Sequence, residues 1–178
     1  MKMIKLNKDQ ARAIKNAAEL DGLSIADRKT LIKMIDVLNG EDQATVKLFV
    51  DGASDLHSKT AGIGGVIYSN DKELSNFSEP LFDKTNNEAE YLALIKGIEK
   101  LIEIKVVSAE IYADSELVVK QVLGIYKVKN ERMKILHNLV LEKLKLIDQW
   151  NLVHIRREKN IRADELSKLG MNKAKIEK

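Results

Sequence analysis

The order of β-type and helical patterns along this chain is the feature that most limits how it can fold. Between residues 46 and 176, three short β-type segments come first, and later ones alternate with segments of helical period. The β-type segments are 46–52, 62–69, 72–81, 108–115 and 150–157, and the helical ones are 87–104, 115–124, 130–148 and 160–176. Grouped strands followed by strand–helix alternation predict an α/β fold, with a five-stranded mixed sheet flanked by helices.

The first 44 residues follow another pattern, which predicts a small helical hairpin. Asn7 with Gln10 has the spacing of a capping box and opens the first helix, which Gly22 ends. Ser24 with Asp27 opens the second helix, which an Asn-Gly pair closes. The predicted organisation is a hairpin at 1–44, an α/β domain at 45–170 and a basic tail at 171–178.

The composition is that of a globular protein with a core. Hydrophobic residues make up 44% of the 178 residues and charged residues 32%. The absence of cysteine excludes disulfides, thiolate metal sites and a cysteine nucleophile. The charged start lacks the apolar run of a signal peptide, and no run approaches the roughly 18 residues that span a membrane. We therefore expect a cytoplasmic protein without a membrane partner.

Charge is unevenly distributed along the chain. Residues 120–178 carry 15 Lys and Arg against 7 Asp and Glu, whereas residues 1–119 carry 15 against 20. A basic C-terminal third beside an acidic remainder hints at a polyanion partner and a cation site, although many proteins that bind neither show such asymmetry. No obligate protein partner is indicated, and a monomer is expected.

Two carboxylates stand at the ends of predicted strands. Asp51 ends the first strand, on the same face as Phe49, and Asp114 ends the fourth. If these strands are parallel neighbours, both acids lie at the edge of the sheet where α/β folds place ligand sites. Because two such anions repel each other, a divalent cation would stabilise the pair, and oxygen ligands suit Mg²⁺ or Mn²⁺.

Two further acids lie in the first turns of predicted helices. Glu90 is in line with Ala93 and Gly97 on one helix face, and Gly97 would let that helix approach the sheet closely. Glu90 is therefore expected to point inward, unlike Glu88, which precedes the apolar stripe. Asp164 lies in the first turn of the last helix, where the helix dipole favours an anion.

Each of these acids also has a simpler interpretation. Asp51 would form a turn with Gly52, Asp114 would cap the next helix, Glu90 would be a solvated helix residue, and Asp164 would only complement the helix dipole. Singly, each simpler interpretation is the more common one. The set of four, and its order relative to the sheet, favours a metal site instead.

Five segments together resemble the type 1 ribonuclease H family, the endonucleases that cut RNA in RNA–DNA hybrids. The resemblance covers about residues 46–170. Within the family, the chain is most similar to the archaeal and bacterial subgroup related to reverse-transcriptase ribonuclease H domains. The matching segments are FVDGAS (49–54), GIGGVIY (62–68), TNNEAEYLALIKGIEKL (85–101), IYADSELVVKQVLGIYKVKN (111–130) and REKNIRADELSKL (157–169).

The resemblance implies a ribonuclease H-like fold and hydrolysis of the RNA strand of hybrids, leaving 5′-phosphate and 3′-hydroxyl ends. It implies two Mg²⁺ ions, with Mn²⁺ possible, held by a catalytic quartet of Asp51, Glu90, Asp114 and Asp164. The substrate contacts that it implies are Gly52, Ala53, Ser54, Thr85, Asn86, Asn87, Ser115, Arg157 and Asn160.

The chain departs from the family in two loops, and two other functions stay open. His57 stands where the family has an Asn in a Gly- and Pro-rich loop, and residues 157–163 lack the histidine of the bacterial type. One alternative is a catalytically silent hybrid-binding module, which the complete quartet disfavours. The other is a related polynucleotidyl transferase such as a resolvase, which would lack Thr-Asn-Asn-x-x-Glu and Asp-Ser-x-x-Val.

Deletion of residues 1–44 tests the role of the predicted hairpin. If the first helix reaches back to residue 5, a basic stripe runs along it through Lys5, Lys8, Arg12 and Lys15. The stripe is expected to be a solvated face of a hairpin that packs on the domain; substrate affinity and self-association are the alternatives. Thermal melting should show lower stability, and binding titrations at several salt concentrations should show nearly unchanged hybrid affinity. A large loss of affinity with an intact fold, and a salt slope reduced by about one per lost phosphate contact, would contradict this.

Overall fold

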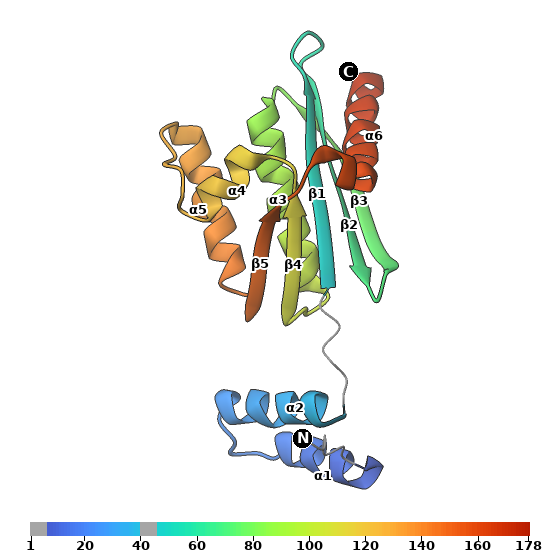
Figure 1. Cartoon of the computed structure of the whole chain (residues 1–178), viewed down its shortest axis with the longest axis vertical. Helices are drawn as coiled ribbons and strands as arrows, with labels where there is room; N and C mark the ends of the chain where they lie inside the picture. Colours follow the sequence, from blue (N-terminus) through green and yellow to red (C-terminus); the bar gives the residue numbers. More distant parts are fainter. Residues whose placement is uncertain (1–6, 40–45) are drawn as a thin grey trace. The chain divides into compact units, whose positions relative to one another are not determined.

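The computed structural model describes residues 7–39 and 46–178, which belong to two compact units, Met1–Ala44 and Thr45–Lys178. The first unit contains α1 (Lys8–Ala18) and α2 (Ile25–Asn39) (Figure 1). Both predicted helix starts are confirmed: Asn7 and Gln10 form a reciprocal capping box, and the Ser24 hydroxyl accepts from the Asp27 backbone N–H. Lys5, at the start of the predicted basic stripe, lies outside the described residues.

The second unit is the predicted five-stranded mixed sheet with flanking helices. Its strand order is β3-β2-β1-β4-β5. β1 pairs antiparallel with β2 and parallel with β4, so the sheet changes from antiparallel to parallel at β1. The elements are β1 (Val46–Asp55), β2 (Thr60–Ser69), β3 (Lys72–Phe82), α3 (Asn86–Glu103), β4 (Ser108–Ala113), α4 (Glu116–Val122), α5 (Glu131–Leu144), β5 (Gln149–His154), the 3₁₀ turn η1 (Arg157–Lys159) and α6 (Ile161–Glu177).

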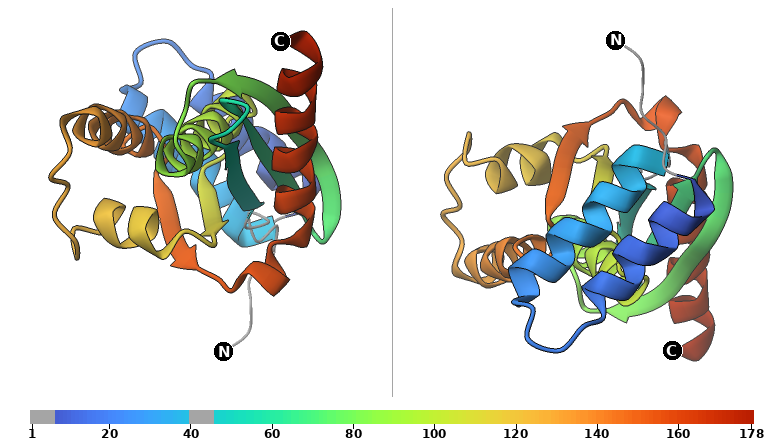
Figure 2. Two further views of the ribbon diagram at one scale, coloured as in Figure 1. Left: turned by 90° about the horizontal axis from the view of Figure 1, so that it is seen from above. Right: turned by 90° about the horizontal axis from the view of Figure 1, so that it is seen from below.

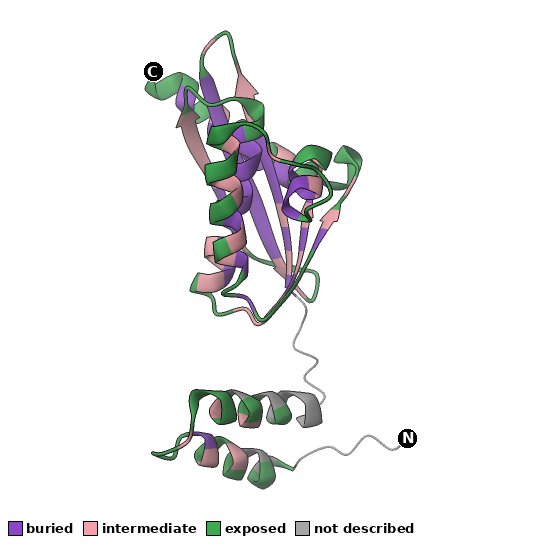
Figure 3. Cartoon of the chain, turned by 90° about the vertical axis from the view of Figure 1, so that its left-hand side faces the viewer, coloured by how far each residue is buried: buried purple, intermediate pink, exposed green. Residues whose placement is uncertain are grey.

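The two faces of the sheet are covered unequally. Along β1, Leu48 and Val50 are fully buried beneath α3, whose neighbour on the same face is α5 (Figure 2). Because side chains alternate along a strand, Phe49 and Asp51 point to the opposite face, where α6 packs on β1, β2 and β3. Buried residues therefore gather in the sheet and on the inner sides of its helices (Figure 3).

Glycines set the closest contacts between helices and sheet. A Cβ on Gly64 of β2 would lie 2.2 Å from the Ser167 backbone nitrogen of α6. A Cβ on Gly97 of α3 would lie 2.8 Å from side-chain carbons of Leu48 and Val50, so the close approach predicted at Gly97 is confirmed. The sheet and these two helices thus pack at a distance that a larger residue would prevent.

The sequence prediction placed several boundaries differently. The first strand was expected to end near residue 52, but β1 continues to Asp55 and forms a hairpin with β2, because the loop after it is only four residues long. Lys59 makes this turn possible with a left-handed φ of 52°. In contrast, α5 ends at Leu144, earlier than the predicted 148.

Residues 171–178 were assigned to a basic tail, although the helical pattern was predicted to continue to residue 176; the structure confirms the helix and not the tail. α6 runs on to Glu177, because small residues keep recurring on its buried face as far as Ala174, which is fully buried. Lys175 forms an ion pair with Asp55 at 2.9 Å, and the Lys178 ammonium donates to the Ser58 carbonyl. The basic residues therefore fix the end of a packed helix.

Within residues 7–39 and 46–178, no helix combines the length and the apolar character needed to cross a membrane.

Gly64→Ala should destabilise the protein much more than Gly97→Ala. The new methyl group at Gly64 meets backbone atoms of α6, which cannot move without shifting the helix, so we expect a loss of about 3 kcal/mol or more. At Gly97 it meets flexible side-chain ends, and a gain of about 1 kcal/mol in helix propensity offsets part of the strain. Denaturant unfolding of both variants measures the difference. Equal losses would contradict the packing described for α6.

Candidate active site

Parallel pairing of β1 with β4 brings two of the predicted acids together. The last register pair of these strands is Val50 with Ala113, so Asp51 and Asp114 follow at the same edge of the sheet. Asp51 is not in a turn, because β1 continues through it. Asp114 does not cap the next helix, because the N-cap of α4 is Ser115. The two simpler interpretations of these acids are therefore excluded.

The start of α3 places Glu90 beside Asp51. A Cβ on Gly52 would lie 2.3 Å from the backbone nitrogen of Glu90, so the first turns of α3 lie directly on β1. The Gly52 backbone also hydrogen-bonds the Glu90 carboxylate. Glu90 is only 8% exposed, which excludes a solvated position.

Glu88 is also buried, which the sequence prediction did not anticipate. Its carboxylate accepts hydrogen bonds from the backbone N–H and the hydroxyl of Thr85, at 2.9 and 2.8 Å, and completes the capping box of α3. Glu88 thus turns back to the end of the helix, as the i, i+3 spacing of a capping box requires. The acid directed to the sheet edge is Glu90, as predicted.

Asp51, Glu90 and Asp114 form a compact cluster of oxygen donors, here called the acid triad. One carboxylate oxygen from each lies within 4.8 Å of the others. Burial, with the charges of Asp114 and Asp164, raises the pKa of Asp51 to about 7. Burial, with the charges of Asp51 and Asp114, raises the pKa of Glu90 to about 9. Three converging carboxylates with this cost of ionisation suit a hard divalent cation such as Mg²⁺ or Mn²⁺.

Asp164, the fourth predicted acid, lies near the acid triad but binds two cations of the protein itself. The Arg157 guanidinium contacts one carboxylate oxygen at 2.5 and 3.1 Å, and the Lys168 ammonium contacts the other at 2.6 Å. Burial opposes ionisation of Asp164, but these hydrogen bonds outweigh it and lower its pKa. Asp164 is therefore an anion held at the edge of the site.

Three site residues on α6 were not predicted from the sequence. The Ser167 hydroxyl hydrogen-bonds Asp51, and Lys168 and Met171 line the hollow beside the acid triad. They follow Asp164 by three, four and seven residues, which is the spacing of one helix face. Extending the helix periodicity from Asp164 would have found them.

The predicted substrate contacts divide into two groups. Gly52, Ala53, Ser54, Asn86 and Arg157 line the hollow of about 410 Å³ that contains the acid triad. The other four do not line it: Thr85 and Ser115 are N-caps, Asn87 is exposed in the first turn of α3, and Asn160 is buried and donates to the Val50 carbonyl at 2.9 Å.

The order of strands and the acids at the edge of β1 and β4 define a ribonuclease H-like protein. Consistent with this, residues 49–170 match the family described as reverse transcriptase-like. The chain belongs to this family, and within it to the type 1 ribonuclease H group.

Three similar proteins illustrate the relationship. Ribonuclease HI of Halobacterium salinarum is 31% identical over 130 residues, which cover 72% of this chain and 65% of that protein. The N-terminal RNase H domain of Rv2228c from Mycobacterium tuberculosis has a TM-score of 0.70 at 29% identity, covering 74% of this chain and 96% of that one. LC11-RNase H1, crystallised in complex with an RNA/DNA hybrid, has a TM-score of 0.68 at 36% identity, covering 73% and 99%. The chain spans less than two thirds of the length of the Halobacterium enzyme.

The metal-free protein should lose stability as the pH rises from about 5 to 9. The unfolded state releases the protons of Asp51 and Glu90 near pH 4, whereas the folded state keeps them up to about pH 7 and 9. Between these values the folded state binds more protons than the unfolded state, so stability falls as the pH rises. Millimolar Mg²⁺ should raise the melting temperature, more strongly at higher pH, because the ion binds deprotonated carboxylates.

Two variants complete this stability test. Asp114→Asn should raise the metal-free melting temperature and weaken its dependence on pH and Mg²⁺, because Asp114 raises the pKa of both buried acids. Glu142→Gln, an exposed change on α5, should behave as wild type. Melting curves that respond neither to Mg²⁺ nor to Asp114→Asn would count against a shared metal site.

Proposed function

We propose that the Thr45–Lys178 unit hydrolyses the RNA strand of RNA–DNA hybrids. The observation that carries this proposal is the convergence of carboxylates from β1, α3 and the end of β4 within 4.8 Å, on the fold of the ribonuclease H group. The complex of LC11-RNase H1 with an RNA/DNA hybrid supports this choice of substrate. A complete acid triad also argues against a silent binding module.

The proposed catalytic and metal-binding residues are Asp51, Glu90, Asp114 and Asp164, which would hold two Mg²⁺ ions, with Mn²⁺ as the alternative. Such ions, when bound, lower the pKa of an attacking water and stabilise the leaving oxygen of the scissile phosphate. The expected products carry 5′-phosphate and 3′-hydroxyl ends.

The chain's own residues prepare this chemistry. Asp51 and Glu90 release their protons when the site fills, and Ser167 keeps the Asp51 carboxylate oriented toward the sheet edge. Arg157 and Lys168 keep Asp164 ionised and beside the acid triad. The exposed Arg157 guanidinium also faces the hollow, where it would bind a substrate phosphate.

We propose that the protein selects hybrids because different residues contact the RNA strand and the DNA strand. Gly52, Ala53 and Ser54 lie beside Asp51 and would approach the 2′-hydroxyls that distinguish RNA from DNA. Thr85 and Asn86, at the exposed start of α3, would contact the backbone of the DNA strand. Cytoplasmic location and a monomeric state stay predictions.

Incubation with a labelled RNA–DNA hybrid tests the proposal directly. Cleavage of the RNA strand is expected with Mg²⁺ or Mn²⁺ and not with EDTA, and single-stranded RNA and duplex DNA should stay intact. End analysis should show 5′-phosphates. Equal cleavage of duplex DNA would instead favour a resolvase-type activity, and metal-dependent binding without cleavage would favour a silent module.

Substitutions in the acid triad should separate chemistry from folding. Asp51→Asn, Glu90→Gln and Asp114→Asn should each reduce hybrid cleavage by orders of magnitude while circular dichroism shows an intact fold, since each removes a ligand charge. Asp164→Asn should have a milder effect.

Glu88→Gln is the matched control for Glu90→Gln. It lies two residues away in α3, and a glutamine at this position can still complete the capping box, so cleavage should continue. An inactive Glu88→Gln beside an active Glu90→Gln would contradict the proposed assignment.

A further inference from the structure

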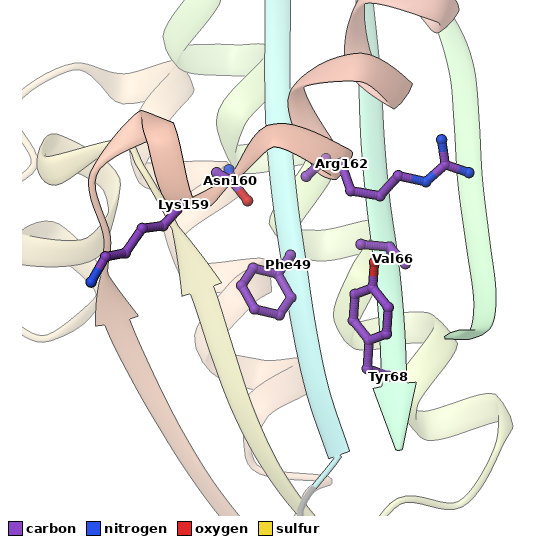
Figure 4. Close-up of a pocket in the computed structure, with 7 residues that line it drawn as sticks. Phe49, Val66, Tyr68, Lys159, Asn160 and Arg162 are labelled. Atoms are coloured by element: carbon purple, nitrogen blue, oxygen red, sulfur yellow. The ribbon is translucent and has the colours of Figure 1, made fainter. Parts of the chain in front are cut away.

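A second pocket lies on the sheet face opposite α3. It has a volume of about 140 Å³ and shares no lining residue with the hollow of the acid triad. Its walls come from β1, β2, η1 and the first turn of α6 (Figure 4). The lining residues are Phe49, Val66, Tyr68, Lys159, Asn160, Arg162 and Ala163.

Asn160, which lines this pocket, has a buried hydrogen-bond acceptor without a partner among the described residues. The side chain is 1% exposed, and its amide nitrogen is occupied by the Val50 carbonyl at 2.9 Å. In the described part of the chain, Asn160 Oδ1 is the one buried side-chain oxygen or nitrogen that has no hydrogen-bond partner. The oxygen lies on the side of the pocket toward Phe49 (Figure 4). Since buried polar atoms are nearly always paired, this position calls for a ligand with an N–H or O–H donor.

The first turn of α6 gives the pocket a positive end. α6 has 17 residues, and no side chain caps its N-terminus, so the first backbone N–H groups remain available to an anion. Lys159 and Arg162 lie on opposite sides of the pocket with their charged ends directed outward (Figure 4). The Arg162 guanidinium forms ion pairs with Glu73 and Glu165, at 3.5 and 3.3 Å. Lys159 is exposed to solvent.

The floor of the pocket is aromatic. The Phe49 ring stacks on Tyr112, with centroids 4.7 Å apart, and meets the edge of Tyr68 at 5.9 Å. All three rings are only partly buried, so the cluster presents apolar ring surface beside the positive end. A void of about 150 Å³ can hold one benzene ring, so this pocket matches a single six-membered ring in size.

We propose that this pocket binds a nucleotide. Its phosphate contacts the first backbone N–H groups of α6, between the flanking charges of Lys159 and Arg162, its base lies against Phe49 and Tyr68, and an amino or hydroxyl group donates to Asn160 Oδ1. Since Asn160 also holds the Val50 carbonyl next to Asp51, an occupant of this pocket contacts a residue that positions the acid triad.

Nuclear magnetic resonance of the ¹⁵N-labelled full chain in EDTA tests this binding without any cleavage step. Cytidine 5′-monophosphate is the probe, because its base has one ring and an amino group. We expect saturable shifts at the backbone amides of Val66, Tyr68 and Ala163 and at the side-chain amide of Asn160. Cytidine and ribose 5-phosphate should each bind at least tenfold more weakly, since each lacks one of the two recognised groups.

Matched variants locate the contact. Phe49→Leu removes the ring and should weaken binding about tenfold, whereas Trp150→Leu, a change at another partly exposed aromatic residue in the sheet, should leave it unchanged. Arg162→Gln, an exposed change that leaves the sheet intact, should weaken binding as well.

Three results would overturn the proposal. They are equal shifts with inorganic phosphate alone, shifts confined to the acid triad, and wild-type affinity in both Phe49→Leu and Arg162→Gln. Each leaves the proposed cleavage of hybrids untouched, because no metal ion or hybrid is present.

Discussion

The contact of α3 with β1 at Gly52 is the constraint on which the site depends. The backbone of Ala89 and Glu90 occupies the space that a side chain at residue 52 would fill. Because α3 lies this close to β1, the Glu90 carboxylate on the helix reaches the site beside Asp51, the residue that precedes Gly52 in the strand. Gly97, two turns later, keeps the same helix close along Leu48 and Val50. The packing of the core and the geometry of the acid triad therefore have one cause.

This arrangement opposes stability in the metal-free protein. Asp51 and Glu90 are buried with like charges as neighbours, and the pKa of each is well above its ordinary value. Raised pKa values of this kind are common at functional sites, where a bound cation would stabilise the ionised carboxylates. Asp164 shows the contrast, because Arg157 and Lys168 neutralise it locally and its pKa is lowered. The four acids thus have two electrostatic environments, although a sequence pattern presents them as equivalent.

Much of this could be predicted from the sequence, because the decisive signals are local. Alternation and helical period gave the element order, and the end of parallel pairing after Val50 placed Asp51 beside Asp114, as expected for neighbouring parallel strands. The extent of β1 was missed, since its last residues are held by pairing with β2, whereas α6 ends within one residue of its predicted end at 176. Glu88 was not expected to be buried, because its burial follows from a side chain turning back to Thr85. Asn160 was predicted as a substrate contact, yet its partner is a backbone carbonyl 110 residues away, which no local pattern reveals.

The position of Ser167 has a consequence for how the protein matures. Its hydrogen bond to Asp51 joins residues 116 positions apart, and α6 supplies it from the last segment of the unit to be synthesised. All five strands precede this helix in the chain, so they leave the ribosome before it does. Loop-closing contacts of such long range also form slowly during folding. The site can therefore be completed only after α6 has been synthesised, because this helix supplies Asp164 and the hydroxyl that orients Asp51.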